Sequence, residues 1–214
     1  MVRVRSAKRR TPSSTEWLKR QLNDPYVAAA HRHGYRSRAA FKLIELDDRF
    51  SLLKRGAKVV DRGCAPGGWT QAAVERVGPC GRVVGIDQTE TAPIAGAVLL
   101  RADLTDEAAI NTIRQALGGE ADLVLSDMAP ATTGHAATDH LRILVLAEAA
   151  FAIAEQILKP NGTFVAKVFQ GGAEGELLAR LKHAFAELRH AKPPASRAES
   201  AETYVIAKGF RKGR

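Results

Sequence analysis

Residues 58–69 read KVVDRGCAPGGW, a short apolar run followed by a glycine-rich turn. The β-branched Val59 and Val60 favour an extended strand, and the paired glycines Gly67 and Gly68 allow a tight turn behind it. A strand that enters a helix through a glycine-rich turn is typical of α/β folds that bind nucleotide-like ligands there. The stretch therefore predicts the first strand and the ligand-binding turn of an α/β domain.

Downstream of this turn the chain alternates between apolar strands and helices. Each expected strand is an apolar run that suits burial on both faces of a parallel sheet. The alternation predicts a single Rossmann-like, doubly wound α/β domain with helices on both faces. The last strand follows Pro193-Pro194 and is expected to return antiparallel at or near one edge. Strands are expected at 58–62, 82–87, 97–102, 122–127, 163–169 and 203–210, and helices at 68–76, 106–117, 139–158 and 175–188.

The positive charge of the chain is concentrated at its N-terminal end. The formal net charge is +9, and residues 1–58 hold 15 Lys and Arg against 5 Asp and Glu. This asymmetry indicates a polyanionic partner, either nucleic acid or an acidic membrane surface. We expect a flexible basic tail over 1–12, a basic helical extension over 13–56 and the α/β domain over 57–214, with 13–214 forming one structural unit.

Two helices are expected within the basic extension. Ser13 and Glu16 have capping-box spacing, which predicts a helix to about residue 22. A polar basic connector at 31–36 then leads to a second helix at 38–53.

Composition argues against several classes of protein. No apolar run reaches the roughly 20 residues of a membrane-spanning helix, and the first residues lack the apolar segment of a secretory signal. Because this segment is rich in arginine and poor in acidic residues, a transit peptide stays open as an alternative. Cys64 and Cys80 are too few for a disulfide scaffold and form no zinc motif, and the histidines show no metal-ligand spacing. We therefore expect a cytoplasmic protein without a metal ion, and a monomer.

The residues of the glycine turn restrict the ligand. Their spacing differs from the G-x-G-x-x-G of dinucleotide-binding domains and from the G-x-x-x-x-G-K-[ST] of P-loops. Asp61 would repel a phosphate, and no lysine stands nearby to bind one. Small residues beside a carboxylate fit a ligand with an amine and a carboxylate but no pyrophosphate, such as S-adenosylmethionine.

Three further aspartates stand at or just after the carboxyl ends of the second, third and fourth strands. They are Asp87, Asp103 and Asp127. Open α/β sheets bind ligands at this edge, where a carboxylate in the position of Asp87 can accept hydrogen bonds from both ribose hydroxyls. Asp103 is placed to meet an adenine amino group. Together with Asp61, these residues predict a ligand site along the edge.

Two lysines stand among apolar residues. Lys167 interrupts the strand FVAKVF at 164–169, where a buried lysine is costly unless it is paired or functional. Nearby carboxylates would hold it charged, whereas burial and a second cation would lower its pKa toward neutrality, as a general base requires. The alternative is a lysine that extends to solvent at the strand end. Lys42, within the helix at 38–53, is by its local sequence a solvated residue.

Four segments together resemble a known family. They are DRGCAPGGW (61–69), SDMAP (126–130), FVAKVF (164–169) and SAETY (200–204). The combination is similar to the FtsJ/RrmJ family of ribose 2′-O-methyltransferases and covers about residues 13–210. The resemblance implies a class I S-adenosylmethionine-dependent methyltransferase fold, with a mostly parallel seven-stranded sheet whose last strand is antiparallel. Length and basic N-terminus resemble the bacterial branch that methylates a uridine ribose in the 23S rRNA of the large ribosomal subunit.

The resemblance also implies roles for individual residues. Lys167 would be the general base, and Glu202 is favoured over Glu199 because it directly precedes the last strand. Arg62 departs from the family pattern, in which this position is usually apolar. An arginine directed into the donor pocket would weaken donor binding, whereas one that points to solvent or pairs with a carboxylate would change little. The family's Lys-Asp-Lys-Glu tetrad falls on Lys42, Asp127, Lys167 and Glu202, and the expected contacts of the methyl donor are Gly63, Gly67, Gly68, Trp69, Asp87, Asp103 and Asp127.

Three other functions stay open on the sequence alone. The same chemistry could act on tRNA or an mRNA cap, although the lack of an extra domain favours rRNA. A non-catalytic RNA-binding factor for ribosome assembly is disfavoured by the presence of both lysines and both carboxylates. A nicotinamide-dependent dehydrogenase is disfavoured by the glycine spacing.

Overall fold

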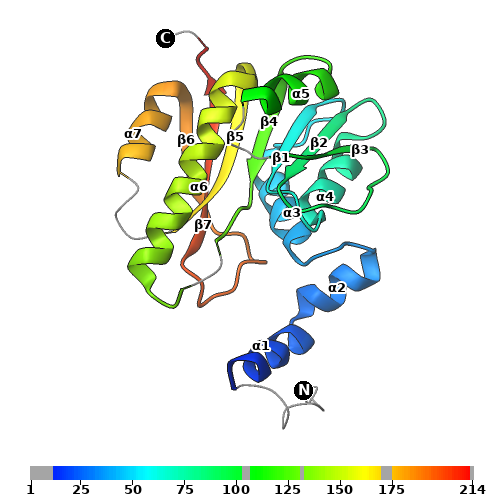
Figure 1. Ribbon diagram of the computed structural model, residues 1–214, viewed down its shortest axis with the longest axis vertical. Helices are drawn as coiled ribbons and strands as arrows, with labels where there is room; N and C mark the ends of the chain where they lie inside the picture. The colour runs from blue at the N-terminus through cyan, green and yellow to red at the C-terminus, as the bar shows by residue number, and fades with distance from the viewer. Residues whose placement is uncertain (1–11, 103–106, 131–132, 170–174, 213–214) are drawn as a thin grey trace.

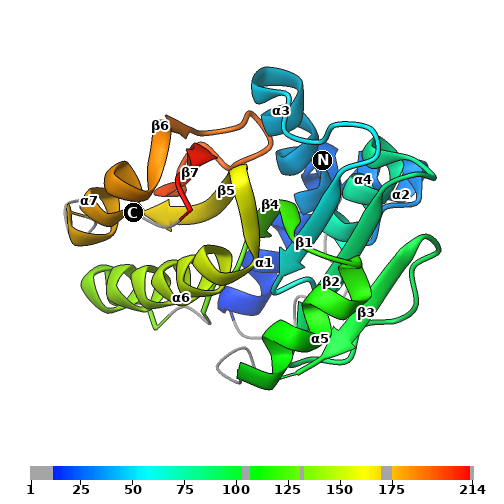
Figure 2. The same ribbon diagram turned by 90° about the horizontal axis from the view of Figure 1, so that it is seen from above.

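The computed structural model describes residues 12–102, 107–130, 133–169 and 175–212. They form a seven-stranded mixed sheet with helices on both faces (Figures 1 and 2). The two N-terminal helices project from the end of the molecule at which the parallel strands finish (Figure 1). This architecture confirms the expected α/β fold.

Six of the seven strands correspond to strands that the sequence predicts, although β5 begins at Leu158 and not at the expected residue 163. The strands are β1 (Lys58–Arg62), β2 (Arg82–Asp87), β3 (Ala97–Arg101), β4 (Ala121–Ser126), β5 (Leu158–Phe169), β6 (Phe185–Ala191) and β7 (Glu202–Phe210). Their order in the sheet is β3-β2-β1-β4-β5-β7-β6. β7 is antiparallel to both β5 and β6, and the other neighbouring pairs are parallel.

The seventh strand, β6, corrects the prediction at the C-terminal end. A helix was expected to continue to residue 188, but α7 (Gly175–Ala184) ends earlier and β6 follows it. β6 forms the edge of the sheet, so β7 lies one strand inside. Only Phe185 and Ala191 of β6 are buried. An edge strand of this kind is largely polar, and it therefore lacks the apolar run from which the other strands were predicted.

The N-terminal extension contains three helices where two were expected. They are α1 (Pro12–Asn23), α2 (Pro25–His33) and α3 (Ala39–Phe50). Asp24 caps α2 by accepting a hydrogen bond from the backbone N–H of Tyr26 at 3.0 Å. Pro25 stands in the first turn, where its missing N–H costs nothing. The residues that stop α1 thus start a new helix, which runs through residues 31–33 of the connector expected at 31–36.

Alternating strand residues divide the core into two hydrophobic clusters. α3 and α4 (Gly68–Val77) cover the face that includes Val59 and Val165. The helices α5 (Glu107–Leu117), α6 (Ala136–Ile157) and α7 cover the opposite face, which includes Val60 and Ala166 (Figure 2). Because side chains alternate along a strand, Lys167 points toward α3, on the same side as Val165.

The register of β5 and β7 brings further polar residues to this face. Lys167 lies opposite Tyr204, and Phe169 lies opposite Glu202. Glu202 and Tyr204 are two residues apart on one strand and therefore share a face. The sheet thus presents a lysine, a tyrosine and a glutamate to α3.

The loop between β6 and β7 is held against the N-terminal helices. Glu45 of α3 accepts hydrogen bonds from the Tyr26 hydroxyl at 2.8 Å and from the backbone N–H of Ala195 at 2.6 Å. Arg38 donates to the carbonyl of Ala195 at 2.6 Å and pairs with Asp24 at 3.0 Å. These contacts fix the loop that leads into Glu202 relative to the helix that carries Lys42.

Replacing Glu45 with alanine should destabilise the protein. The change removes the acceptor of two partly buried hydrogen bonds, and we expect a loss of about 1–3 kcal/mol in the free energy of unfolding. Asp48→Ala is the matched control, since Asp48 lies on the same helix but is exposed and pairs with the partly exposed Arg76, so its loss should be at most about 1 kcal/mol. Urea unfolding of both variants measures the difference, and equal losses would contradict the bracing role of Glu45.

Candidate functional site

The polar residues of the site lie at the topological switch point of the sheet. β1 lies between β2 and β4, and the chain proceeds outward in opposite directions from these central strands. Ligands of open α/β sheets bind beyond the carboxyl ends of the strands at such a point. Asp61 of β1, Asp87 of β2 and Asp127, directly after β4, all stand at this edge.

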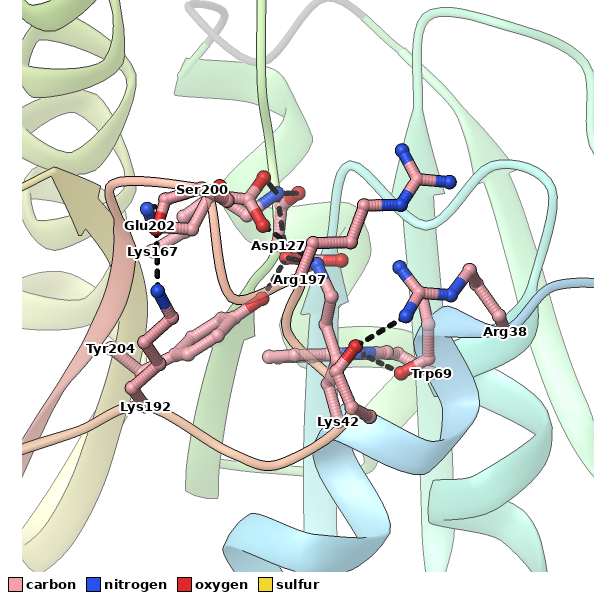
Figure 3. A network of polar contacts seen from close by, with 12 residues as sticks. Arg38, Lys42, Trp69, Asp127, Lys167, Lys192, Arg197, Ser200, Glu202 and Tyr204 are labelled. Atoms are coloured by element: carbon pink, nitrogen blue, oxygen red, sulfur yellow. Dashed lines mark hydrogen bonds and ion pairs between the residues drawn. The ribbon is translucent and has the colours of Figure 1, made fainter. Parts of the chain in front are cut away.

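Two lysines and two carboxylates form one compact cluster beside this point (Figure 3). Lys167 Nζ lies 2.7 Å from Asp127 Oδ1 and 3.4 Å from Glu202 Oε1, and it donates to the backbone carbonyl of Asp127 at 2.9 Å. Lys42 Nζ lies 3.1 Å from Glu202 Oε2 and 4.0 Å from Asp127 Oδ1. The four residues come from α3, the loop after β4, β5 and β7, and the structure brings them together as the resemblance implied.

Both lysines are buried. Lys42 is 6% exposed and Lys167 is 5% exposed, so neither extends to solvent. The solvated position suggested for Lys42 by its local sequence is wrong, because α3 packs this side against the sheet. Glu199 is exposed, whereas Glu202 lies within the cluster. The contacts therefore select Glu202 over Glu199.

The charge balance in the cluster keeps Lys167 protonated. Burial lowers the pKa of the Lys167 ammonium, but the attraction of Asp127 and Glu202 outweighs burial, so the pKa is raised above its ordinary value. Burial also acts on Glu202, but the two lysines prevail and lower the pKa of its carboxyl group. In the protein alone, the two carboxylates thus affect the pKa of Lys167 more strongly than burial does, a comparison that the sequence could not decide.

Tyr204 belongs to the cluster and was not assigned a role from the sequence. Its hydroxyl donates to Asp127 Oδ1 at 2.5 Å, and Lys42 Nζ lies 5.8 Å from the centre of its ring. Burial, together with the negative charge of Asp127, raises the pKa of the Tyr204 hydroxyl well above its ordinary value. The available signal was the spacing of Glu202 and Tyr204, which places both on one face of a strand.

The other carboxylates of the edge are held in place by short contacts. Asp61 is fully buried and accepts a hydrogen bond from the Thr70 hydroxyl at 2.6 Å. Asp87 accepts from the backbone N–H groups of Ala65 at 3.0 Å and Thr89 at 2.7 Å. Each oxygen of Asp87 keeps a second lone pair for a ligand. Asp103 lies outside the described residues.

The glycines of the turn allow neighbouring segments of the protein to pack closely against it. A Cβ atom on Gly63 would lie 2.2 Å from Met128 Cγ, and one on Gly68 would lie 2.2 Å from Ser37 Oγ. Gly67, with a φ of 113°, would place a Cβ 2.6 Å from Ile94 Cδ1. Side chains are therefore excluded because the loop after β4, the N-terminal extension and the loop after β2 approach closely. Contacts of these three glycines with a methyl donor stay a prediction.

Trp69 and Arg62 also use their side chains within the protein. The Trp69 indole N–H donates to the carbonyl of Ala39 at 2.8 Å, and its ring lies 5.6 Å from that of Tyr204. Trp69 thereby links the glycine turn to α3 and to the lysine–carboxylate cluster, while its part in donor binding stays a prediction. Arg62 is 2% exposed and donates to the carbonyl of Leu146 in α6 at 3.2 Å. The Arg62 guanidinium is thus hydrogen-bonded to the backbone of α6.

Metal-binding clusters and membrane-spanning helices are both absent from the described part of the chain. Within these residues, no group of three His, Cys, Asp or Glu side chains is arranged to hold a metal ion. Among the helices formed by the same residues, none combines the length and apolar character needed to cross a membrane.

Comparison with known proteins identifies the family to which the chain belongs. A model of the FtsJ-like methyltransferases matches residues 35–210. The chain belongs to this family. The match includes α3 and all seven strands, so every residue of the Lys42–Asp127–Lys167–Glu202 cluster lies within the FtsJ-like region.

Individual relatives of the FtsJ-like chain are similar over nearly its whole length. The ribosomal RNA large subunit methyltransferase E of Rhodospirillum rubrum is 61% identical over 98% of this chain and 81% of the relative. The protein of the same name from Paramagnetospirillum magneticum is 60% identical over 98% of this chain and 88% of the relative.

Solved structures agree with the fold. A Plasmodium falciparum chain described as a ribosomal RNA methyltransferase has a TM-score of 0.73 at 30% identity, covering 82% of this chain and 98% of its own. The fibrillarin/Nop5p complex, at a TM-score of 0.58 and 19% identity over 79% of this chain and 81% of that chain, shares the fold.

Asp61 should make stability depend on pH. Burial raises the pKa of Asp61 to about 7 from 3.8, with smaller contributions from Asp127 and Asp87. Between these values the folded protein binds more protons than the unfolded chain, so stability falls as pH rises. Asp61→Asn should remove this pH dependence. The free energy of unfolding of the variant, relative to that of the parent, should therefore rise by about 2–3 kcal/mol from about pH 5 to about pH 8.

Urea unfolding across this pH range measures the effect. Asp48→Asn, an exposed carboxylate replaced in the same way, should leave the pH dependence of the parent unchanged. Parallel stability curves for the parent and Asp61→Asn would show that Asp61 does not titrate in this range.

Proposed function

We propose that this protein transfers a methyl group from S-adenosylmethionine to the ribose 2′-hydroxyl of a uridine in the 23S rRNA of the large ribosomal subunit. The observation that carries the proposal is the Lys42–Asp127–Lys167–Glu202 cluster, whose two lysines are buried, beside the ligand-binding edge of an FtsJ-like fold. Relatives about 60% identical over nearly the whole chain, named ribosomal RNA large subunit methyltransferase E, support the choice of RNA.

The residues at the edge fit a cationic donor without phosphates. Asp61, Asp87 and Asp127 place three carboxylates at the ends of adjacent strands, and Arg62 is engaged by α6. S-adenosylmethionine would supply a methyl group already activated by a sulfonium centre. The residues that would hold it are Gly63, Gly67, Gly68, Trp69, Asp87, Asp103 and Asp127.

Lys167 is the general base in this proposal. Its ammonium makes three contacts with Asp127 and Glu202, which fix the position of the nitrogen. After losing a proton, that nitrogen would accept the proton of the ribose 2′-hydroxyl. Lys42 and Tyr204, bound to the same two carboxylates, would keep Asp127 and Glu202 in place while the charge of Lys167 changes. Precise placement of the reacting groups is a large part of such catalysis.

The basic N-terminal region would bind the RNA backbone. Residues 1–58 hold the excess of positive charge, and α1 and α2 project from the end of the molecule that carries the cluster (Figure 1). Phosphate contacts from this region would hold a loop of RNA over the edge of the sheet. We place the enzyme in the cytoplasm and expect it to act as a monomer without a metal ion.

The direct test is transfer of a labelled methyl group from S-adenosylmethionine. Undermethylated large ribosomal subunits, free rRNA and tRNA are compared as acceptors, and we expect label in the ribose of 23S rRNA. Lys167→Ala should abolish turnover and leave donor binding nearly intact. Lys167→Arg should also be inactive, because arginine keeps the positive charge between Asp127 and Glu202 but does not release its proton.

The other outcomes separate the alternatives. Label in tRNA alone would change the substrate and keep the chemistry. No transfer by a protein that binds the donor would favour a non-catalytic assembly factor. Near-normal turnover by Lys167→Arg would overturn the assignment of the base.

The rate should rise with pH well above neutrality. Because the pKa of Lys167 is raised above its ordinary value, the neutral fraction of this amine increases about tenfold per pH unit through this range. We expect log kcat/KM to rise with a slope of about one between about pH 8 and about pH 9.5, above the titration of Asp61. Single-turnover methyl transfer measures the profile, and a plateau beginning near pH 7 would contradict it.

Removing residues 1–12 should weaken RNA binding and reduce its dependence on salt. Five Lys and Arg lie in this segment, and the slope of log affinity against log salt should fall by about 0.7–0.9 for each phosphate that the shortened protein no longer neutralises. Affinity for S-adenosylmethionine should stay unchanged. Filter binding at several salt concentrations checks the effect, and equal slopes for both forms would exclude an interaction of this segment with RNA.

A further inference from the structure

Arg36 stands in the cationic extension, yet its guanidinium is directed at the loops of the donor edge. Nη1 donates to the carbonyl of Pro66 at 3.2 Å and to that of Ala92 at 2.6 Å, and Nη2 donates to the carbonyl of Pro93 at 2.6 Å. Three backbone carbonyls from two separate loops thus converge on one side chain.

These two loops border the expected donor site. Pro66 immediately precedes Gly67 in the turn after β1, and Ala92 and Pro93 lie in the segment 88–96 after Asp87 of β2. Segment 88–96 contacts the turn at Gly67 through Ile94. Arg36 is therefore a bridge between the turn that starts α4 and the loop that leaves β2.

The backbone around Arg36 is fixed to α4 by other contacts. The Arg36 N–H donates to Gln71 Oε1 at 2.8 Å, and Gln71 Nε2 donates to the carbonyl of Gly34 at 3.0 Å. The Tyr35 hydroxyl donates to Glu75 Oε2 at 2.5 Å. A Cβ on Gly67 would lie 3.1 Å from Arg36 Nη1, so the glycine allows the guanidinium to lie directly against the turn.

We propose that Arg36 is a positioning residue for the methyl donor. It holds the glycine turn and segment 88–96 at the separation that the donor requires, and it does so from the extension rather than from the α/β domain. The inference rests on the proposed function for the identity of the donor.

The chemistry of the side chain suits this bridge. A planar guanidinium carries several N–H donors in a fixed fork and can serve carbonyls that lie in different directions, whereas the compact ammonium of lysine cannot reach them together. An RNA phosphate that recruited Arg36 would have to replace three formed hydrogen bonds. Arg36 and the nearby Arg32 are both exposed, but Arg32 makes no hydrogen bond or ion pair with the residues that the structure describes.

The test compares Arg36→Ala and Arg36→Lys with Arg32→Ala as the matched control. Calorimetry with S-adenosylmethionine, without RNA, should show donor affinity about tenfold weaker in Arg36→Ala, restored only in part by Arg36→Lys. Arg32→Ala should bind the donor as the parent does. With RNA present, Arg36→Ala should raise the KM for the donor and leave kcat within about twofold.

A second readout needs no ligand. Amide hydrogen exchange in segment 88–96 should be faster in Arg36→Ala than in the parent, because the carbonyl contacts that hold the segment are gone. The same segment in Arg32→Ala should exchange as in the parent. Thermal unfolding checks that Arg36→Ala remains folded.

The outcomes separate this inference from the proposed function. A parent protein that binds no S-adenosylmethionine would overturn the proposed function, and unchanged exchange in segment 88–96 would overturn the bridging role of Arg36. Parent-like donor affinity in Arg36→Ala would overturn the inference. Loss of RNA binding alone in that variant would do the same and would identify Arg36 as an RNA contact.

Discussion

The ion pair between Lys167 and Asp127 constrains the rest of the structure. A charged lysine on an inner strand is strongly unfavourable unless carboxylates and hydrogen bonds replace its water. The required partners come from the loop after β4, from β7 and, through Lys42, from α3. These segments can meet only if β7 inserts beside β5 and if α3 packs on that face of the sheet. The strand order and the charge pairing therefore depend on each other.

The same pairing explains why residues remote from the edge matter to it. Lys42 and Glu202 lie 160 positions apart in the sequence. The distance between their side chains depends on how α3 packs against the loop after β6. Glu45 and Arg38 fix this packing through hydrogen bonds with the backbone of Ala195. Trp69 adds a link from the glycine turn to Ala39 and toward Tyr204. Several neutral and charged contacts thus define the same geometry of the site.

Much of this arrangement was visible in the sequence, and the remainder depends on tertiary contacts. Central strands are apolar runs, so β1 and β2 were predicted with their observed bounds, and Lys167 stood out because it interrupts such a run. The edge strand β6 is polar and gave no such signal. α2 was missed because Asp24-Pro25 can end one helix and begin another. The burial of Lys42, the hydrogen bond of Tyr204 to Asp127 and the reach of Arg36 each depend on a partner from a distant segment, which local patterns do not contain.

The close fit between residues 34–39 and the glycine turn bears on where the functional unit begins. Ser37 lies over Gly68, Ala39 receives the indole N–H of Trp69, and Gly34 binds Gln71. The extension is thus part of the wall around the turn, although by composition it belongs to the basic region. A fragment cut at residue 57 would retain every strand and lose that wall together with Lys42. Grafting this methyltransferase onto an RNA-binding module would therefore require a junction before Gly34 rather than at the start of the sheet.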